Sequence, residues 1–170
     1  MIFGKERDLR LMTIRRGGTL TDEDHRLLAL WAVDCAEHVL GYFEDAVPGD
    51  GRPRQAIEAA RAWTRGDLPM MRSRALGGHA NGAARPLRGA AREAAYAAGQ
   101  AACVPHVAEH GLGAAAYAIR AARAAANPDE RDQAGRDECA WQRQQLPEPV
   151  RDLVLDDQKR RNQYCWGLFT

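Results

Sequence analysis

GAAREAAYAAGQAACVPHVAEHGLGAAAYAIRAARAAAN, residues Gly89–Asn127, is the stretch that decides the fold, and alanine dominates it. Alanine has the highest helix propensity because it loses no side-chain entropy on ordering. Pro105 removes a backbone donor inside the run, so we expect one kinked helix or two consecutive helices. Pro128 marks the end of the stretch, because the residue before a proline is pushed out of the helical region. Small side chains let other helices come close, so we expect neighbouring helices to supply the bulk, with the four tryptophans as candidates.

Helical patterns also precede this stretch. Thr21 is a suitable N-cap, and apolar residues recur behind it at spacings of three and four up to about Ala46. Pro53 suits the first turn of a second helix, which Gly66 ends. We expect a third helical piece to begin near Leu68 or Pro69, and it contains four residues that weaken a helix: Gly77, Gly78, Asn81 and Gly82. We therefore expect this third piece to be short or frayed.

Two further helices are expected after Pro128. The first covers about Asp129–Gln145 and is polar, and the second begins at Pro147. The residues of the first that we expect to be buried are Ala134, Cys139, Ala140 and Trp141. The chain then closes with an aromatic tail, which we expect to fold back onto the body or to contact a second chain.

Together these patterns predict an all-α fold, a single domain of about six or seven helices with a short N-terminal arm. Nothing alternates with a period of two over any length, so we expect no sheet. Within the single helical domain of residues 1–170, we assign 1–18 to the arm, 19–157 to the helical body and 158–170 to the aromatic C-terminal tail.

Composition bounds the partners and the compartment. The formal net charge is +1, which gives no global attraction to nucleic acid or to an anionic membrane. No apolar run approaches the roughly 20 residues that a membrane span requires, and the first residues lack the apolar core of a signal peptide. The four cysteines lie far apart in sequence and form no CxxC pair. We therefore expect a cytoplasmic protein with free thiols and no membrane partner.

His106 and His110 form the sharpest chemical motif. Histidines four apart project from one face of a helix, which is how a helix offers two imidazoles to zinc or another divalent metal. The string also fits the H-x-x-E-H pattern of inverted zinc peptidases, but no third protein ligand stands out. His79 would supply one only if the glycine-rich bend folds over the pair. The simpler interpretation has no cofactor and two partly buried histidines bonded to their neighbours.

A second set of polar residues could share a pocket with these histidines. Asp24 and His25 open the first long helix, and Arg52 and Arg54 flank Pro53 in a turn. The candidate binding pocket therefore comprises Asp24, His25, Arg52, Arg54, His79, His106 and His110. The alternative is that the arginines form ion pairs within the chain, with carboxylates such as Asp34, Glu37 and Glu44. No phosphate-binding glycine loop and no nucleophile elbow is present, so we expect binding more than catalysis.

Three segments, together with the region of Trp141-Gln142-Arg143 and Leu146-Pro147, resemble the immunity proteins of bacterial polymorphic toxin systems. They read TLTDEDHRLLALWAVDCAEHVL (Thr19–Leu40), DGRPRQAIEAARAWTRG (Asp50–Gly66) and AREAAYAAGQAACVPHVAEHGLGAAAYAIRA (Ala91–Ala121). The strongest markers are Asp24-His25-Arg26, Arg52-Pro53-Arg54 with Ile57, and His106 with His110. The sequence departs from the family pattern at Val104-Pro105, Gly77-Gly78 and Asn81-Gly82.

The resemblance implies a small helical protein that binds a cognate protein toxin and neutralises it. We hypothesise that a basic nuclease toxin would meet the acids Asp22, Glu23, Asp24, Glu44 and Asp45. The alternative is a small helical metal- or ligand-binding protein or enzyme that uses the His/Asp/Arg pocket. A third interpretation is self-association as a homodimer through the aromatic tail.

Overall fold

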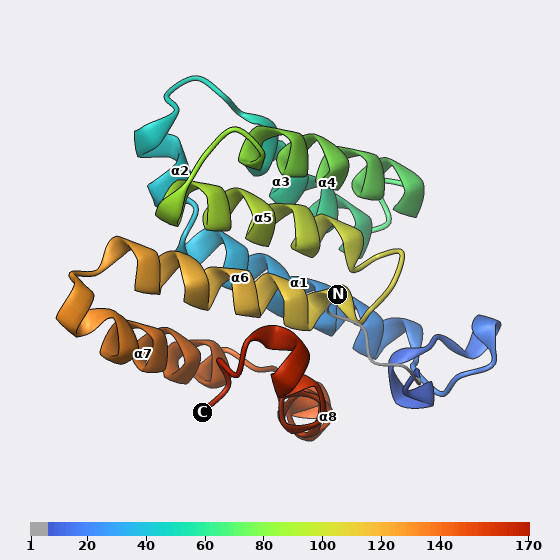
Figure 1. Cartoon of the computed structure of the whole chain (residues 1–170). Coiled ribbons are helices and arrows are strands. Elements are labelled where there is room, and N and C mark those ends of the chain that lie inside the picture. The colour runs from blue at the N-terminus through green and yellow to red at the C-terminus, as the bar shows by residue number, and fades with distance from the viewer. Residues whose placement is uncertain (1–6) are drawn as a thin grey trace.

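The computed structural model describes residues 7–170, which form helices and no strand (Figure 1). The α-helices are α1 (Asp22–His38), α2 (Gly41–Ala46), α3 (Arg52–Thr64), α4 (Met70–Ala84), α5 (Gly89–Cys103), α6 (His110–Ala125), α7 (Arg131–Gln144) and α8 (Glu148–Arg161). Four short 3-10 helices are η1 (Leu9–Leu11), η2 (Ile14–Arg16), η3 (Pro128–Glu130) and η4 (Asn162–Cys165). The all-α fold with a short N-terminal arm is confirmed.

The alanine-rich stretch forms two consecutive helices at the centre of the molecule. Helix α5 packs on α4 and α3, while α6 packs on α7 and α1, and α5 and α6 pack on each other (Figure 1). A turn over residues 104–109 separates them and contains Pro105, as the missing backbone donor predicts. Helix α6 ends at Ala125, before the predicted stop at Asn127–Pro128.

Helix α4 is complete from Met70 to Ala84, so the expectation of a short or frayed piece is wrong. Gly77 and Gly99 explain why. A methyl group built on Gly77 would lie 2.7 Å from the backbone oxygen of Gly99 in α5, closer than real side chains approach. The glycine therefore allows two helices to pack backbone against backbone, and this packing stabilises α4 in spite of its weak intrinsic propensity.

Only one of the four tryptophans fills the core. Trp31 is 1% exposed, whereas Trp63 and Trp141 are partly exposed and Trp166 is 49% exposed. The largest fully buried apolar side chains besides Trp31 are Phe43, Leu40, Ile57 and Ile119. The prediction that tryptophans supply the bulk is therefore confirmed for Trp31 and in part for Trp63, which packs against the core, whereas Trp141 and Trp166 lie at the surface.

The first long helix is also shorter than predicted. Thr21 caps it as expected, its Oγ1 accepting a hydrogen bond from the Asp24 N–H at 3.0 Å. The helix ends at His38, and α2 starts afresh at Gly41. The intervening residues Val39 and Leu40 are buried, as is Phe43 in α2. A straight helix would carry these apolar side chains past the core. The break directs them into the core instead, and α2 packs on α5.

Helix α7 buries polar residues that the sequence pattern did not indicate. Glu138 and Gln142 are buried together with Cys139, whereas Ala140 is exposed and Ala134 and Trp141 are only partly buried. Hydrogen bonds explain the difference. The Trp31 Nε1–H donates to the Gln142 backbone oxygen at 2.8 Å, and the Gln142 side chain donates to the Ala115 oxygen at 3.1 Å. Polar groups in α7 therefore hold it against α1 and α6.

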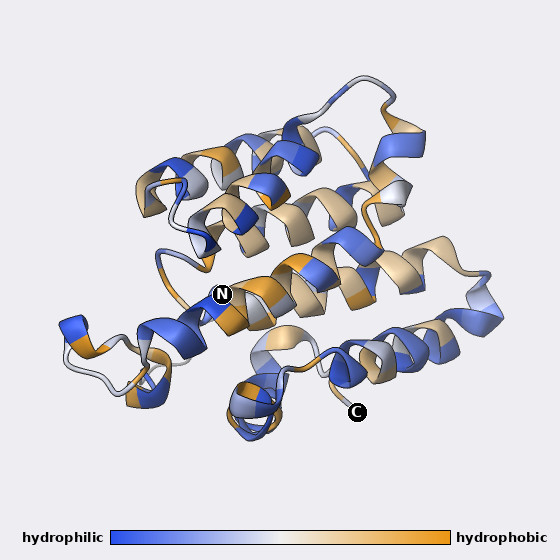
Figure 2. Cartoon of the chain, turned by 180° about the vertical axis from the view of Figure 1, so that it is seen from behind, coloured by the Kyte–Doolittle hydropathy of each residue, from blue (hydrophilic) through white to orange (hydrophobic). Residues whose placement is uncertain are grey.

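The chain end returns to the body. Helix α8 continues to Arg161, beyond the expected end of the body at residue 157. Cys165 and Phe169 are buried, and Trp166 makes an edge contact with Tyr117 of α6 at 5.3 Å. Figure 2 shows the contrast that results, since the central helices carry apolar residues while α7 and α8 are mostly hydrophilic. No helix in residues 7–170 is both long enough and apolar enough to cross a membrane.

Candidate functional site

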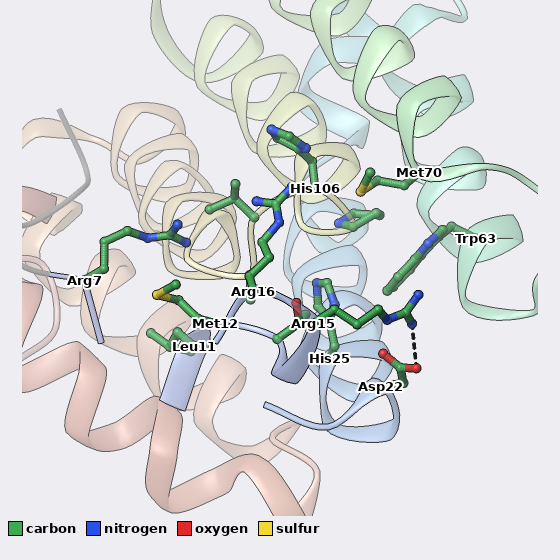
Figure 3. A pocket seen from close by; sticks show the side chains of 14 residues that line it. Arg7, Leu11, Met12, Arg15, Arg16, Asp22, His25, Trp63, Met70 and His106 are labelled. Carbon is green, nitrogen blue, oxygen red and sulfur yellow. Dashed lines mark hydrogen bonds and ion pairs between the residues drawn. The ribbon is translucent and has the colours of Figure 1, made fainter. Parts of the chain in front are cut away.

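A cavity of about 270 Å³ lies where the N-terminal arm, the start of α1, the end of α3 and the α5–α6 turn meet (Figure 3). We call it the arm cavity. Its lining comprises Arg7, Leu11, Met12, Thr13, Arg15, Arg16, Asp22, His25, Trp63, Met70, Pro105, His106, Val107 and Ala108. Three arginines and one carboxylate among these residues make it a polar, cationic cavity with apolar walls.

His25 and His106 are the two members of the predicted pocket that the fold brings together here. The buried His25 ring donates from Nε2 to the Val104 backbone oxygen at 2.8 Å and makes an edge contact with Trp63 at 4.9 Å. Burial lowers the pKa of His25, because a charged ring would lose its hydration. This histidine is thus a neutral group that joins α1 to the α5–α6 turn.

His106 is bonded differently. Its Nδ1 atom is shielded from solvent and has no hydrogen-bond partner among residues 7–170. Burial lowers the pKa of His106, and the positive charges of Arg74, Arg16 and Arg7 lower it further. A buried polar atom without a partner is uncommon in a folded protein, so the hydrogen-bonding capacity of this nitrogen is unused among the described residues.

The three arginines of the cavity differ in their partners. Arg7 makes two hydrogen bonds to the Glu109 carboxylate, at 2.9 and 3.0 Å. Arg15 pairs with Asp22 at 2.7 Å. Within the part of the chain that the structure describes, the Arg16 side chain has no hydrogen bond or ion pair, and Figure 3 shows its guanidinium directed toward His106. Arg16 therefore supplies a positive charge that nothing in the described chain neutralises.

The expected helical face shared by His106 and His110 is not formed. His106 lies in the α5–α6 turn and His110 is the first residue of α6, because Pro105 interrupts the helix between Cys103 and His110. The Nδ1–H of His110 donates to the Gln100 side-chain oxygen at 2.8 Å. Burial, with the nearby His106 as a second cause, lowers the pKa of His110 to about 4. Among residues 7–170, no group of three or more His, Cys, Asp or Glu side chains is arranged to hold a metal ion.

The other predicted pocket residues lie elsewhere. Arg52 pairs with Asp50 at 2.5 Å, and Arg54 pairs with Glu44 at 2.6 Å, both at the N-terminal end of α3. His79 is exposed on α4, and Asp24 does not line the cavity. The ion-pair interpretation of the two arginines is thus confirmed, and the seven residues do not form one pocket.

Sequence reasoning missed most of the cavity. In the sequence, Arg15 and Arg16 mark only the end of the arm before Gly17 and Gly18, and nothing indicates that they line a cavity. A short bridge fixes their place: the backbone of Thr13 pairs with that of Leu20, closing the arm into a loop beside the start of α1. No local pattern predicts that this loop faces residues 105–108, which lie far away in sequence.

A second concave surface lies between the end of α1, α2, the end of α6 and α7. We call it the α1–α7 groove. It consists of two adjoining hollows of about 500 and 350 Å³ that share His38 and Trp141. The remaining lining residues are Asp34, Glu37, Tyr42, Ala122, Ala125, Ala126, Ala134, Asp137, Glu138 and Gln145. Four carboxylates and no lysine or arginine therefore line it.

The groove has a rigid aromatic centre. The His38 ring stacks on Trp141 at 3.6 Å with the two planes 12° apart, and its Nδ1 contacts the buried Glu138 carboxylate at 2.8 Å. Tyr42 is 40% exposed at the same surface. Glu37 is paired with Arg61 of α3, whereas Asp137 makes its hydrogen bond with the neutral Gln133 side chain at 2.6 Å. The negative charge of Asp137 is therefore not cancelled by an ion pair within the described chain.

The fold and the surface define an all-helical protein with a cationic cavity and an open acidic groove. A family model described as "Imm-5 like putative immunity protein" matches residues 18–149. Because the match covers most of the chain, the protein belongs to this family, and the expected resemblance is confirmed. Neither a curated protein nor a solved structure matches the chain.

Proposed function

We propose that the protein binds a cognate toxin domain in the cytoplasm and neutralises it by covering the toxin's active site. The observation that carries this proposal is membership of the immunity-protein family over residues 18–149. Neutralisation by occlusion requires a preformed surface with a few well-packed contacts at its centre. The proposal therefore needs a surface on this chain that meets that description.

The α1–α7 groove is the surface that fits best. Tryptophan and tyrosine are enriched among the residues that dominate binding energies, and Trp141 and Tyr42 are both accessible there. Stacking on His38 holds the Trp141 ring in place, so that little side-chain entropy would be lost on binding. The carboxylates around it favour a basic partner surface, such as the one a nuclease presents to its nucleic acid.

The acids that the sequence suggested for this role fit it less well. Asp22 is paired with Arg15, and Glu44 is paired with Arg54. An ion pair within the chain offers a partner less net charge than a free carboxylate does. Asp137 of the groove is better placed, because it has no ion pair among residues 7–170, and Asp34 makes only a long ion pair with Arg61 at 3.9 Å.

A binding measurement tests the proposal. A candidate toxin domain from the same genome is titrated with the wild-type protein and with Trp141→Ala by calorimetry. We expect tight binding to the wild type and about a thirtyfold loss in the variant, the size typical of a central aromatic contact. Trp166→Ala is the matched control, since Trp166 is also partly exposed but lies against Tyr117.

The outcomes distinguish an error in the proposed binding surface from an error in the proposed function. If the wild-type protein does not bind the toxin, toxin neutralisation itself is wrong. If it binds and both tryptophan variants bind equally well, the groove is the wrong surface. Asp137→Lys serves as a second variant, because this exposed position can change charge without disturbing the core.

A further inference from the structure

The arm cavity has features that toxin binding does not use. It brings together an arginine without a partner, a shielded histidine nitrogen without a partner, and apolar walls. The buried nitrogen is unfavourable as it stands, since it has lost its hydrogen bond to water, and the exposed guanidinium is available to an incoming group. Their position on one cavity suggests a common ligand.

The charges of the residues that line the cavity determine the sign of the charge on that ligand. Arg7 and Arg15 are matched by Glu109 and Asp22, respectively, so these two pairs cancel. Arg16 remains, and it lines the cavity together with His106, toward which its guanidinium is directed (Figure 3). A negatively charged group placed between them would accept hydrogen bonds from both, and a cation would be repelled.

We propose that the arm cavity binds a small organic anion whose carboxylate or phosphate group is held between the Arg16 guanidinium and the His106 imidazole. The body of this ligand is apolar, because it lies against Met12, Trp63 and Met70. The volume of about 270 Å³ is slightly below the usual range of roughly 300–1,000 Å³ for small-molecule pockets, so the ligand has few atoms.

Because of the position of the cavity, a bound ligand would contact both the N-terminal arm and the helical body. Its walls come from the N-terminal arm and from the α5–α6 turn, and His25 joins that turn to α1. An anion bridging Arg16 and His106 would therefore tie the arm to the body. At the cavity the arm is otherwise held by two ion pairs, Arg7 with Glu109 and Arg15 with Asp22.

The test compares benzoate, phenyl phosphate and the uncharged isostere benzamide as probes of the purified full-length protein. Binding is followed by NMR through the Trp63 indole and His106 ring signals. We expect both anions to shift these signals with saturation, and benzamide to bind about tenfold more weakly because it lacks the charge-assisted hydrogen bonds. Arg16→Gln should weaken the anions about tenfold and leave benzamide unchanged.

Controls keep the result interpretable. Arg16 is exposed, so its replacement should not alter the thermal midpoint, and Arg85→Gln on the distant end of α4 should leave all three probes unaffected. Equal binding of benzoate and benzamide, or unchanged benzoate binding to Arg16→Gln, would overturn the proposal. If the free anions do not bind but Arg16→Gln weakens the toxin complex, the anionic group is a carboxylate of the protein partner and the small-ligand proposal is wrong.

Discussion

Two adjacent glycines on α4 have opposite roles at the residue scale. Gly77 lies against the backbone of α5, whereas a methyl group on Gly78 would meet nothing within 4 Å. We expect Gly77→Ala to lower the free energy of unfolding by about 2 kcal/mol, because overpacking outweighs the gain in helix propensity. Gly78→Ala should raise it by about 0.5–1 kcal/mol. Urea unfolding of both variants measures this, and equal effects at the two positions would contradict the packing explanation.

We expect His110 to make the free energy of unfolding depend on pH. Burial lowers its pKa from 6.5 to about 4, so between these values the unfolded chain binds a proton that the folded chain does not. The free energy of unfolding should therefore be highest above pH 6.5 and fall as the pH drops toward 4. The contribution of this one group is on the order of 3 kcal/mol.

Replacing the histidine tests this dependence. His110→Gln removes the titrating group, so its loss of stability between pH 6.5 and 4 should be smaller than that of the wild type. His79→Gln on the exposed face of α4 is the matched control and should keep the wild-type slope. Chemical unfolding at pH 7, 6, 5 and 4 gives the slopes, and a parallel loss in all three proteins would show that His110 is not responsible.

The same residues show what the sequence can and cannot predict. The cap at Thr21 and the turn at Pro105 follow from local chemistry, and both are confirmed. The role of Gly77 depends on a neighbour in another helix, so local propensity gave the wrong result. The cavity residue Arg16 was missed for the same reason, since its position depends on how the arm folds back.

At the scale of elements, α8 depends on a buried ion pair. Arg161 and Asp157 have side chains only 8% and 5% exposed, and Arg161 also donates to the Glu109 backbone oxygen at 3.2 Å. Arg161→Met would leave a carboxylate buried without its partner and should cost about 3–5 kcal/mol. Arg160→Met is the control, because Arg160 pairs with Asp8 at a more exposed position and should cost less than about 1 kcal/mol.

A double-mutant cycle isolates this pair. Asp157→Leu combined with Arg161→Met removes both charges, so its effect on the free energy of unfolding should be smaller than the sum of the single effects. We expect a coupling energy of about 2 kcal/mol or more. Additive effects within about 0.5 kcal/mol would mean that the two side chains do not support α8 through each other.

Helix positions were largely predictable because alanine content, caps and prolines act locally. The break between α1 and α2 was not, since it depends on where Leu40 and Phe43 find a place in the core. The buried face of α7 was not predictable either. Gln142 reads as a surface residue by type, and only its partners on α1 and α6 make its burial favourable.

At the scale of the whole molecule, charge is distributed unevenly although the formal net charge is only +1. The α1–α7 groove is lined by four carboxylates, so association with a basic toxin should slow as salt screens the attraction. We expect the association rate constant to fall about tenfold between 50 and 500 mM NaCl in stopped-flow experiments. Asp137→Asn should reduce that salt dependence, and a rate that rises with salt would show that a different, apolar surface is used.

Neutralisation of a toxin in living cells is the most direct test of the central claim. The toxin domain is expressed alone, with the wild-type chain, with Trp141→Ala or with Trp166→Ala, and colony formation is counted. We predict that the wild type and Trp166→Ala restore growth, whereas Trp141→Ala does so only weakly at the same protein level. Equal killing by the toxin with and without the wild-type chain would contradict the claim.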